Sequence, residues 1–187
     1  MTEPTLPWPG YRTAPEKFNL AADALDAAIA RGCGAHAALV GDHDAVTYAS
    51  LLQRVNSIAA SLIELGLKRG DLVLIKMGNS PEFAGAFLAA VKLGIIPVLV
   101  NSLLSAGELQ SVLDQAQPKL IFTETARAGA VRESRRRGFN FQVVCVDGAS
   151  ENEIAFESLT ANSTNDIAPA NTLANEPAFI VYTSGTT

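Results

Sequence analysis

Residues 72–100 read LVLIKMGNSPEFAGAFLAAVKLGIIPVLV, and their hydrophobic pattern indicates the fold class. Its first six residues are apolar at nearly every position, which is typical of a strand in a sheet that is covered on both faces. Asn79-Ser80-Pro81-Glu82 predicts a helix start, because a serine can cap a helix and a proline fits its first turn. Gly94 is expected to end this helix, and residues 96–100 are expected to form a second buried strand. A strand, a helix and a strand in this order predict a parallel pair.

Part of the same stretch, residues 83–100, approaches the length of a membrane-spanning helix. Lys92 lies in its middle, and Gly94 and Pro97 interrupt it, so a helix, a tight turn and a strand are the better interpretation. The N-terminus has no basic start followed by an apolar core, so no signal peptide is expected. Together with two unpaired thiols, these features predict a cytoplasmic protein without a membrane span.

The rest of the chain repeats the alternation of helices and strands. Asn19, Thr47 and Ser105 are predicted helix caps, and Ser105 with Glu108 has the spacing of a capping box. Residues 148–176 show weak periodicity and are interpreted as a loop or linker. The pattern predicts an α/β fold, a three-layer, largely parallel sheet flanked by helices. Helices are expected over 19–31, 47–65, 105–117 and 126–137, strands over 120–123, 141–146 and 178–182 (the last one buried), and a hairpin over 37–48.

Composition excludes several classes of protein. The 187 residues carry 14 basic and 19 acidic side chains, and the net charge of −5 gives no reason to expect nucleic acid as a partner. Hydrophobic residues make up 48% of the chain, which is too many for a disordered protein. Residues 1–18, rich in proline, are expected to form an extended arm, and residues 19–187 one α/β domain.

Few side chains before the last predicted strand suggest chemistry. Cys33 and Cys145 are far apart and lack ligand spacing, so neither a disulfide nor a zinc site is indicated, and Cys145 is expected in a buried strand. His36 and His43 are interpreted as surface or turn residues, and no metal ligand is expected in the chain. The run 135–137 of three arginines is expected at a solvated helix end.

The last predicted strand leads directly into Thr183-Ser184-Gly185-Thr186-Thr187. Such a loop suits phosphate, because glycine lets the backbone approach closely, successive N–H groups form an anion-binding nest and hydroxyls add donors. The lysine and spacing of the common G-x-x-x-x-G-K-[ST] loop are absent. From composition alone, an ordinary turn remains the alternative.

The segment Val181-Tyr182-Thr183-Ser184-Gly185-Thr186-Thr187 resembles the start of the phosphate loop of the adenylate-forming superfamily, which includes acyl-CoA synthetases, peptide-synthetase adenylation domains and firefly luciferase. Further landmarks follow in the family's order, so the resemblance covers about residues 19–187. They are Val46-Thr47-Tyr48 with Leu51-Leu52, Leu65-Gly66 with Lys68-Arg69-Gly70-Asp71, Asn79-Ser80-Pro81-Glu82, and Leu93-Gly94-Ile95-Ile96-Pro97-Val98.

Two segments are similar to the benzoate- and 2-aminobenzoate-CoA ligases. They are Phe18-Asn19-Leu20-Ala21 with Leu25-Asp26, and residues 97–104. An aromatic, benzoate-like carboxylate is therefore the favoured acid. A fatty-acyl or peptide-synthetase-type adenylating enzyme is an alternative, and so is a non-catalytic α/β binding module.

The resemblance implies a ligase that uses ATP, Mg²⁺ and CoA. A carboxylate would attack ATP to give an acyl-adenylate, and CoA would then displace AMP to give a thioester. Thr183, Ser184, Gly185, Thr186 and Thr187 would bind the β- and γ-phosphates. Lys92 falls near a basic residue that some aryl-CoA ligases place against a CoA phosphate, the alternative being a solvated lysine near a helix end.

The family pattern continues beyond the second threonine as G-x-P-K-G, and this sequence ends first. The chain is therefore expected to be a partial N-terminal domain that ends inside the phosphate loop, with no catalytic residue of its own. Alone it is predicted to be inactive. Surfaces that the missing part would cover predict self-association, for example as a dimer.

Overall fold

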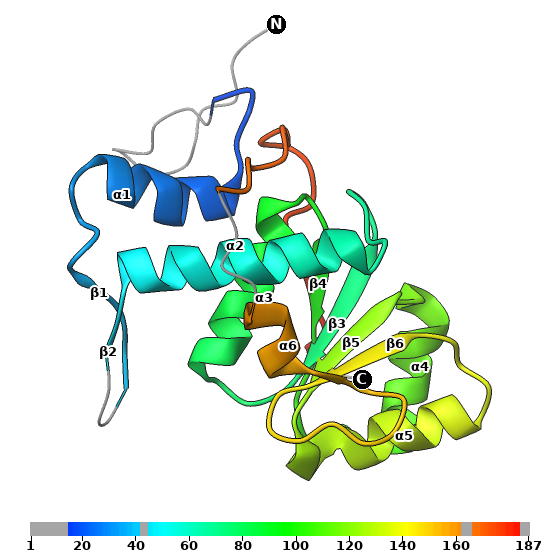
Figure 1. Ribbon diagram of the computed structural model, residues 1–187. Coiled ribbons are helices and arrows are strands. Elements are labelled where there is room, and N and C mark those ends of the chain that lie inside the picture. Colours follow the sequence, from blue (N-terminus) through cyan, green and yellow to red (C-terminus); the bar gives the residue numbers. More distant parts are fainter. Residues whose placement is uncertain (1–14, 42–44, 162–165, 184–187) are drawn as a thin grey trace, which may run out of the picture.

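The computed structural model describes residues 15–41, 45–161 and 166–183, and their centre is a six-stranded sheet (Figure 1). The strand order is β7-β6-β5-β3-β4-β8, and every neighbouring pair is parallel. Val73 of β3 lies between Pro97 of β4 and Leu120 of β5. The strands are β3 (Leu72–Lys76), β4 (Ile96–Leu99), β5 (Leu120–Thr123), β6 (Gln142–Cys145), β7 (Ile154–Ala155) and β8 (Ile180–Val181).

Helices cover both faces of this sheet, which makes the three layers. One face packs against α2 (Tyr48–Glu64), α3 (Pro81–Lys92) and α6 (Phe156–Thr160), and the other against α4 (Ala106–Ala116) and α5 (Ala128–Arg136). Strand residues alternate between two cores because successive side chains point to opposite faces: Val73 and Ile75 join the first core, and Leu74 joins the second. The predicted fold class is confirmed.

The predicted caps start three of these helices. The Thr47 hydroxyl accepts from the Ser50 amide, and the Ser80 hydroxyl accepts from the Phe83 amide. Ser105 and Glu108 form both halves of a capping box at the start of α4. Local sequence thus determines where the helices begin.

An N-terminal layer lies beside α2 and α3. It contains a π-helical turn η1 (Ala22–Asp26), α1 (Ala27–Ala30), and an antiparallel hairpin of β1 (Ala37–Val40) and β2 (Ala45–Thr47). The Asn19 carboxamide oxygen accepts from the amides of Ala21 and Ala22, as the predicted cap should. Ahead of it, Lys17 bridges to Leu173, and most of the predicted arm lies outside the described residues.

Two predictions about the later part of the chain are wrong. The segment expected to be a loop contains β7 and α6, and Phe156 and Leu159 are 4% and 1% exposed in the core. These elements are too short for a hydrophobic period to develop. The expected buried strand over 178–182 is reduced to β8, and its Ile180 and Val181 are 37% and 52% exposed. They are exposed because β8 pairs with β4 on one side only among the described residues. No helix in the described part of the chain is long and apolar enough to cross a membrane.

Candidate functional site

A cavity of about 700 Å³ opens at the carboxyl edge of the sheet. Its floor and sides come from the segments that follow β3, β4 and β8, together with the first turns of α3 and α4. The lining mixes apolar and polar side chains: Met77, Gly78, Asn79, Phe83, Leu99, Val100, Asn101, Ser102, Leu104, Glu108, Val112, Val181, Tyr182 and Thr183. We call this cavity the edge crevice.

The strand connections explain why the crevice lies there. The chain leaves β3 towards α3 on one face of the sheet, and it leaves the adjacent β4 towards α4 on the other face. Two neighbouring strands whose connections diverge in this way leave a gap outside their carboxyl ends, which is where open parallel sheets bind ligands. The topology therefore marks the edge crevice as the candidate site.

Strand β8 delivers the predicted phosphate-binding segment to the rim of this crevice. The Tyr182 amide donates to the Leu99 carbonyl at 2.9 Å, which extends the pairing with β4, and the Tyr182 hydroxyl donates to Gln115 Oε1 at 3.1 Å. Thr183 follows and lines the crevice. Ser184, Gly185, Thr186 and Thr187 lie outside the described residues. Of the five predicted phosphate ligands, the structure therefore places Thr183.

Another wall of the crevice is the tight turn that follows β4 and ends in the capping box. Asn101 Oδ1 accepts from the Leu103 amide at 2.9 Å, and the Asn101 carbonyl accepts from the Leu104 amide at 3.1 Å. Hydrogen bonds from the Ser105 hydroxyl and amide hold the pKa of Glu108 below its usual range. Glu108 is thus an anion at neutral pH on this side of the crevice.

Beneath that wall lies a buried lysine that is not among the site residues predicted from the sequence. Lys76, the last residue of β3, is 2% exposed, and its Nζ donates to the Ser102 carbonyl at 2.7 Å and to the Arg127 carbonyl at 3.4 Å. Burial, and then the nearby Arg127 charge, lower the pKa of Lys76. A signal was present in the sequence, since this position interrupts an otherwise apolar strand.

Lys92, the weak candidate for CoA phosphate, lies at the opposite end of α3 from the crevice. It is 1% exposed, so the interpretation as a solvated lysine is wrong. Its Nζ contacts Asp26 Oδ1 and Asn56 Oδ1, each at 2.9 Å. A contact with CoA stays a prediction, and it would require the ammonium group to leave these partners.

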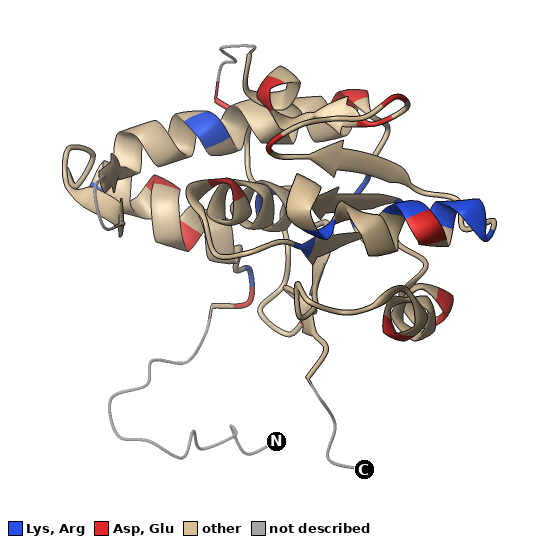
Figure 2. Ribbon diagram, turned by 90° about the horizontal axis from the view of Figure 1, so that it is seen from below, with Lys and Arg blue, Asp and Glu red and all other residues tan. Residues whose placement is uncertain are grey.

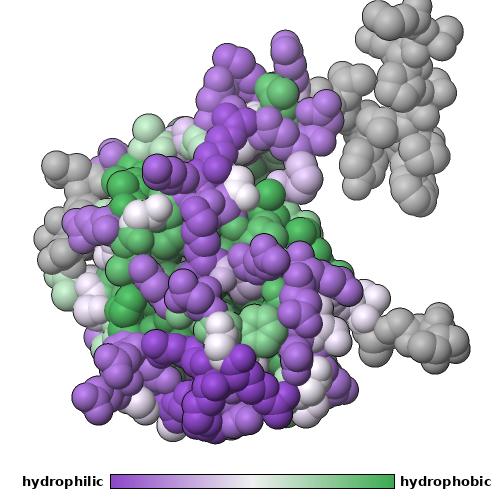
Figure 3. All heavy atoms as spheres, turned by 90° about the vertical axis from the view of Figure 1, so that its right-hand side faces the viewer, coloured by the Kyte–Doolittle hydropathy of each residue, from purple (hydrophilic) through white to green (hydrophobic). Residues whose placement is uncertain are grey.

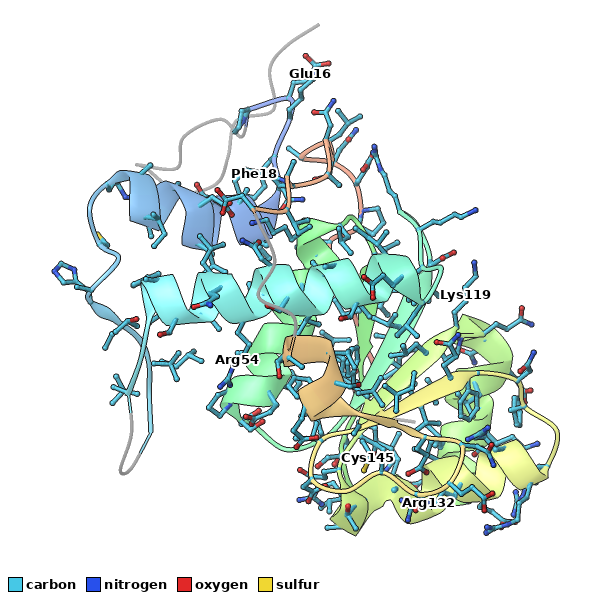
Figure 4. The ribbon with its side chains drawn as sticks, in the orientation of Figure 1. Glu16, Phe18, Arg54, Lys119, Arg132 and Cys145 are labelled. Carbon is cyan, nitrogen blue, oxygen red and sulfur yellow. The ribbon has the colours of Figure 1, made fainter. Side chains whose placement is uncertain are left out.

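The cysteines and histidines considered in the sequence analysis do not line the crevice where the structure describes them. Cys145 is buried at the end of β6, Cys33 is half-buried, and both are free thiols. Figure 4 shows Lys119 beside the amino ends of the strands and Cys145 at their carboxyl ends. His36 is exposed, and His43 lies outside the described residues. Within the described ranges no three His, Cys, Asp or Glu side chains gather as a metal site.

The arginine run ends α5 as expected. Figure 2 shows blue and red segments side by side at the end of this helix, where Arg136 and Arg137 both pair with Glu133. Basic side chains in a last helical turn interact favourably with the carbonyl end of the helix dipole. This is a helix-end cluster with its own counter-ion.

The parallel sheet with helices on both faces, and the crevice at its carboxyl edge, define an open α/β protein with a crevice where folds of this class bind ligands. The sequence profile described as "AMP-binding enzyme" matches residues 25–187. The chain therefore belongs to the AMP-binding enzyme family.

Curated relatives include three kinds of CoA ligase. A 4-coumarate:CoA ligase 1 of Petunia hybrida is 33% identical over 75% of this chain and 26% of its own length. A 4-hydroxybenzoate/benzoate–CoA ligase of Rhodopseudomonas palustris is 25% identical over 91% of this chain and 32% of its own. An acetyl-coenzyme A synthetase of Streptomyces avermitilis is 30% identical over 91% of this chain and 30% of its own. The chain thus spans between a quarter and a third of the length of these relatives.

Solved structures match the fold closely. The anthranilate CoA ligase AuaEII, solved with anthranoyl-AMP, superimposes with a TM-score of 0.86 at 22% identity, over 93% of this chain and 34% of that one. A benzoate CoA ligase of Burkholderia xenovorans LB400 superimposes with a TM-score of 0.71 at 23% identity, over 87% and 32%. These likenesses establish a shared fold, that of the N-terminal domain of adenylate-forming enzymes.

Proposed function

We propose that this chain is the N-terminal part of an AMP-forming acid–CoA ligase. In that reaction a carboxylate oxygen attacks the α-phosphate of ATP, forming an acyl-adenylate and releasing pyrophosphate. The CoA thiol then attacks the acyl carbon, forming a thioester and releasing AMP. The observation that carries the proposal is the placement of Thr183, at the head of the Thr/Ser/Gly segment, on the rim of the edge crevice.

Within that ligase, the proposed role of Thr183, Ser184, Gly185, Thr186 and Thr187 is to bind the β- and γ-phosphates. Hydroxyl groups and backbone N–H groups are suitable donors for phosphate oxygens, and glycine allows a close backbone approach. Mg²⁺ would arrive with the nucleotide, since this ion is usually held by phosphates and one or two carboxylates. When bound, it would offset the phosphate charge that shifts during adenylation.

The proposed acid is aromatic. The ligases for 4-coumarate, benzoate and anthranilate among the relatives and structural neighbours support this choice, as do residues 18–26 and 97–104. An aliphatic acid is the second candidate substrate, because an acetyl-coenzyme A synthetase is 30% identical to this chain. The use of ATP and CoA together with two free thiols supports a cytoplasmic location.

The experiment is acid-dependent exchange of labelled pyrophosphate into ATP. A protein that extends this chain to the length of its relatives is expected to exchange with benzoate or 4-coumarate faster than with acetate or octanoate. The 187-residue chain itself is expected to show none, because a site assembled from only part of the sheet lacks preorganised groups around the α-phosphate.

Three results of this experiment would contradict parts of the proposal. Exchange that is fastest with acetate would overturn the aromatic assignment, but the proposal of an acid–CoA ligase would stand. Exchange by the 187-residue chain would overturn its proposed inactivity. Tight ATP binding by the short chain, combined with no exchange by the extended protein, would replace the ligase with a non-catalytic binding module.

We also propose that the 187-residue chain self-associates. Phe179, Ile180 and Val181 are 42%, 37% and 52% exposed along β8, whose outer edge has no partner strand among the described residues. Figure 3 shows apolar surface exposed between hydrophilic side chains on one side of the molecule. Exposed apolar strand edges favour pairing with another chain.

A further inference from the structure

Lys76 occupies a buried position of β3, in a row where the other side chains are apolar. Residues 72, 74 and 76 of β3 point to the same face because side chains alternate along a strand. Leu74 is buried there in the core beneath α4 and α5, with Leu72 packed against that core. The next position along this row places an ammonium group, 2% exposed, at the carboxyl edge of the sheet.

The contacts of this ammonium group are two backbone carbonyls from different segments. Ser102, 2.7 Å away, belongs to the turn that leads from β4 into α4, and this turn is the wall of the edge crevice. Arg127, 3.4 Å away, belongs to the turn that leads from β5 into α5. Among the described residues no carboxylate forms a salt bridge with Lys76, and the nearby Glu124 is paired with Arg127.

Burial of an ammonium group without a carboxylate partner is unfavourable, and an apolar side chain of similar length would fill the same space without that cost. Stability of the sheet therefore gives no reason for a lysine here. What the lysine provides is a fixed link between the two turns, because three donors on one rigidly buried atom can hold two carbonyls at once. One of those turns is the crevice wall.

We propose that Lys76 is a positioning residue for the edge crevice. It ties the wall formed by residues 100–104 to the carboxyl edge of β3 and to the start of α5. The wall is thereby held at a fixed separation from the end of β8, where Tyr182 and Thr183 lie. The geometric part of the proposal stands on the described residues alone, and only the identity of the ligand in the crevice rests on the proposed function.

The test compares K76M, which keeps the length of the side chain and removes its donors, with K119M. Lys119 is an exposed lysine that pairs with Asp71 before β5, so K119M is a matched control away from the crevice. In the 187-residue chain, K76M should raise amide exchange at Leu104 by about tenfold and increase backbone mobility over residues 101–104, with strand amides unchanged. Its thermal midpoint should stay the same or rise, and K119M should leave the wall unaltered.

A second variant, K76Q, separates the effect of the hydrogen-bond donors from that of the charge. K76Q retains amide donors without the charge and should show a smaller increase in exchange than K76M. An ordered wall in K76M would overturn the proposal. Unfolding of both variants would overturn it too, because Lys76 would then be needed for stability rather than for the position of the wall.

In the extended protein, K76M should raise the KM for ATP by about tenfold with a smaller change in kcat, because a displaced wall weakens binding before it alters chemistry. The two proposals fail separately. If the wall is mobile in K76M but the unaltered extended protein shows no pyrophosphate exchange, the ligase proposal is wrong and the positioning role of Lys76 still holds. Exchange with an unchanged KM in K76M would show that the wall does not serve ATP, and would overturn that part of the inference.

Discussion

At the scale of single residues, the buried polar contacts around Lys92 connect the N-terminal layer to the sheet. Lys92 at the end of α3 reaches Asp26 in η1 and Asn56 in α2. Asn19 adds three hydrogen bonds from one amide, to the carbonyls of Val91, Lys92 and Ala170. A buried cation that contacts two elements stabilises their relative position only while both partners remain, because its desolvation must be offset.

Lys92→Ala is therefore expected to lower the free energy of unfolding by about 3 kcal/mol. It leaves Asn56 Oδ1 without its donor in the interior, and it removes the partner of Asp26, whose Oδ2 is already buried without a hydrogen bond among the described residues. Urea denaturation followed by circular dichroism measures the loss. Lys68→Ala, at an exposed lysine, serves as the control and should change stability by less than about 0.5 kcal/mol. Equal effects of the two substitutions would contradict the buried network. In the extended protein, a raised KM for CoA in a folded Lys92→Ala variant would support the CoA contact.

Among the helices and strands, α4 helps to form the edge crevice, because its first turn is part of the crevice wall. Ser105 caps the helix, and Glu108, which completes the capping box, lines the crevice. The Ser105 amide donates to the Glu108 carboxylate as one half of the capping box, and the Ser105 hydroxyl donates to the same carboxylate oxygen, so the start of the helix also fixes a carboxylate in the wall.

Ser105→Ala is expected to destabilise the chain by about 1 kcal/mol through loss of the cap. It should also raise the pKa of Glu108 part of the way towards its ordinary value, because the hydrogen bond from the Ser105 hydroxyl is lost while the bond from the amide of residue 105 remains. A depressed carboxyl pKa stabilises the fold above the unfolded-state pKa, and this contribution disappears as the pH falls through the folded-state value. The difference between variant and parent should therefore shrink in acid.

Thermal unfolding at neutral and acidic pH, with NMR titration of Glu108, checks this expectation. Ser111→Ala, at an exposed position in the same helix, is the control and should change neither the pKa of Glu108 nor the pH dependence. A pKa for Glu108 that is the same in parent and Ser105→Ala would refute the capping explanation.

At the scale of the whole molecule, the two edges of the sheet differ. At the β7 edge, Ile154 and Ala155 are half-buried, and Phe156 and Leu159 of the following α6 pack into the core. The β8 edge presents apolar side chains, where Phe179 makes an edge-to-face contact with Phe87 at 5.5 Å between ring centroids. This asymmetry makes the β8 edge the expected surface of self-association.

Light scattering over a range of concentrations should show the mass of the chain rising towards that of a dimer. Val181→Lys places a charge on the edge and should keep the chain monomeric. Val40→Lys, at a residue 81% exposed on the hairpin, adds the same charge elsewhere and should leave association unchanged. A parent chain that stays monomeric at high concentration would contradict the proposal, as would equal inhibition by both variants.

Much of the fold could be predicted because its signals are local. The apolar runs of β3 to β6, the capping residues Thr47, Ser80 and Ser105, and the terminating Gly66 and Gly94, both at positive φ, act within a few residues of chain. The short elements over 154–160 could not be found in this way. Phe156 and Leu159 are buried because α2 and the sheet lie over them, and no nearby residue encodes that contact.

The candidate site divides in the same way. The family resemblance, the α/β alternation and the Thr/Ser/Gly segment after the last strand could be predicted, because motif and period are properties of consecutive residues. That Thr183 and the turn after β4 line one crevice follows from the strand order in the folded chain. The burial of two lysines likewise depends on the fold: Lys76 contacts backbone carbonyls, and Lys92 contacts the Asp26 carboxylate. Strand order and burial depend on contacts between residues far apart in the chain, so a local pattern cannot specify them.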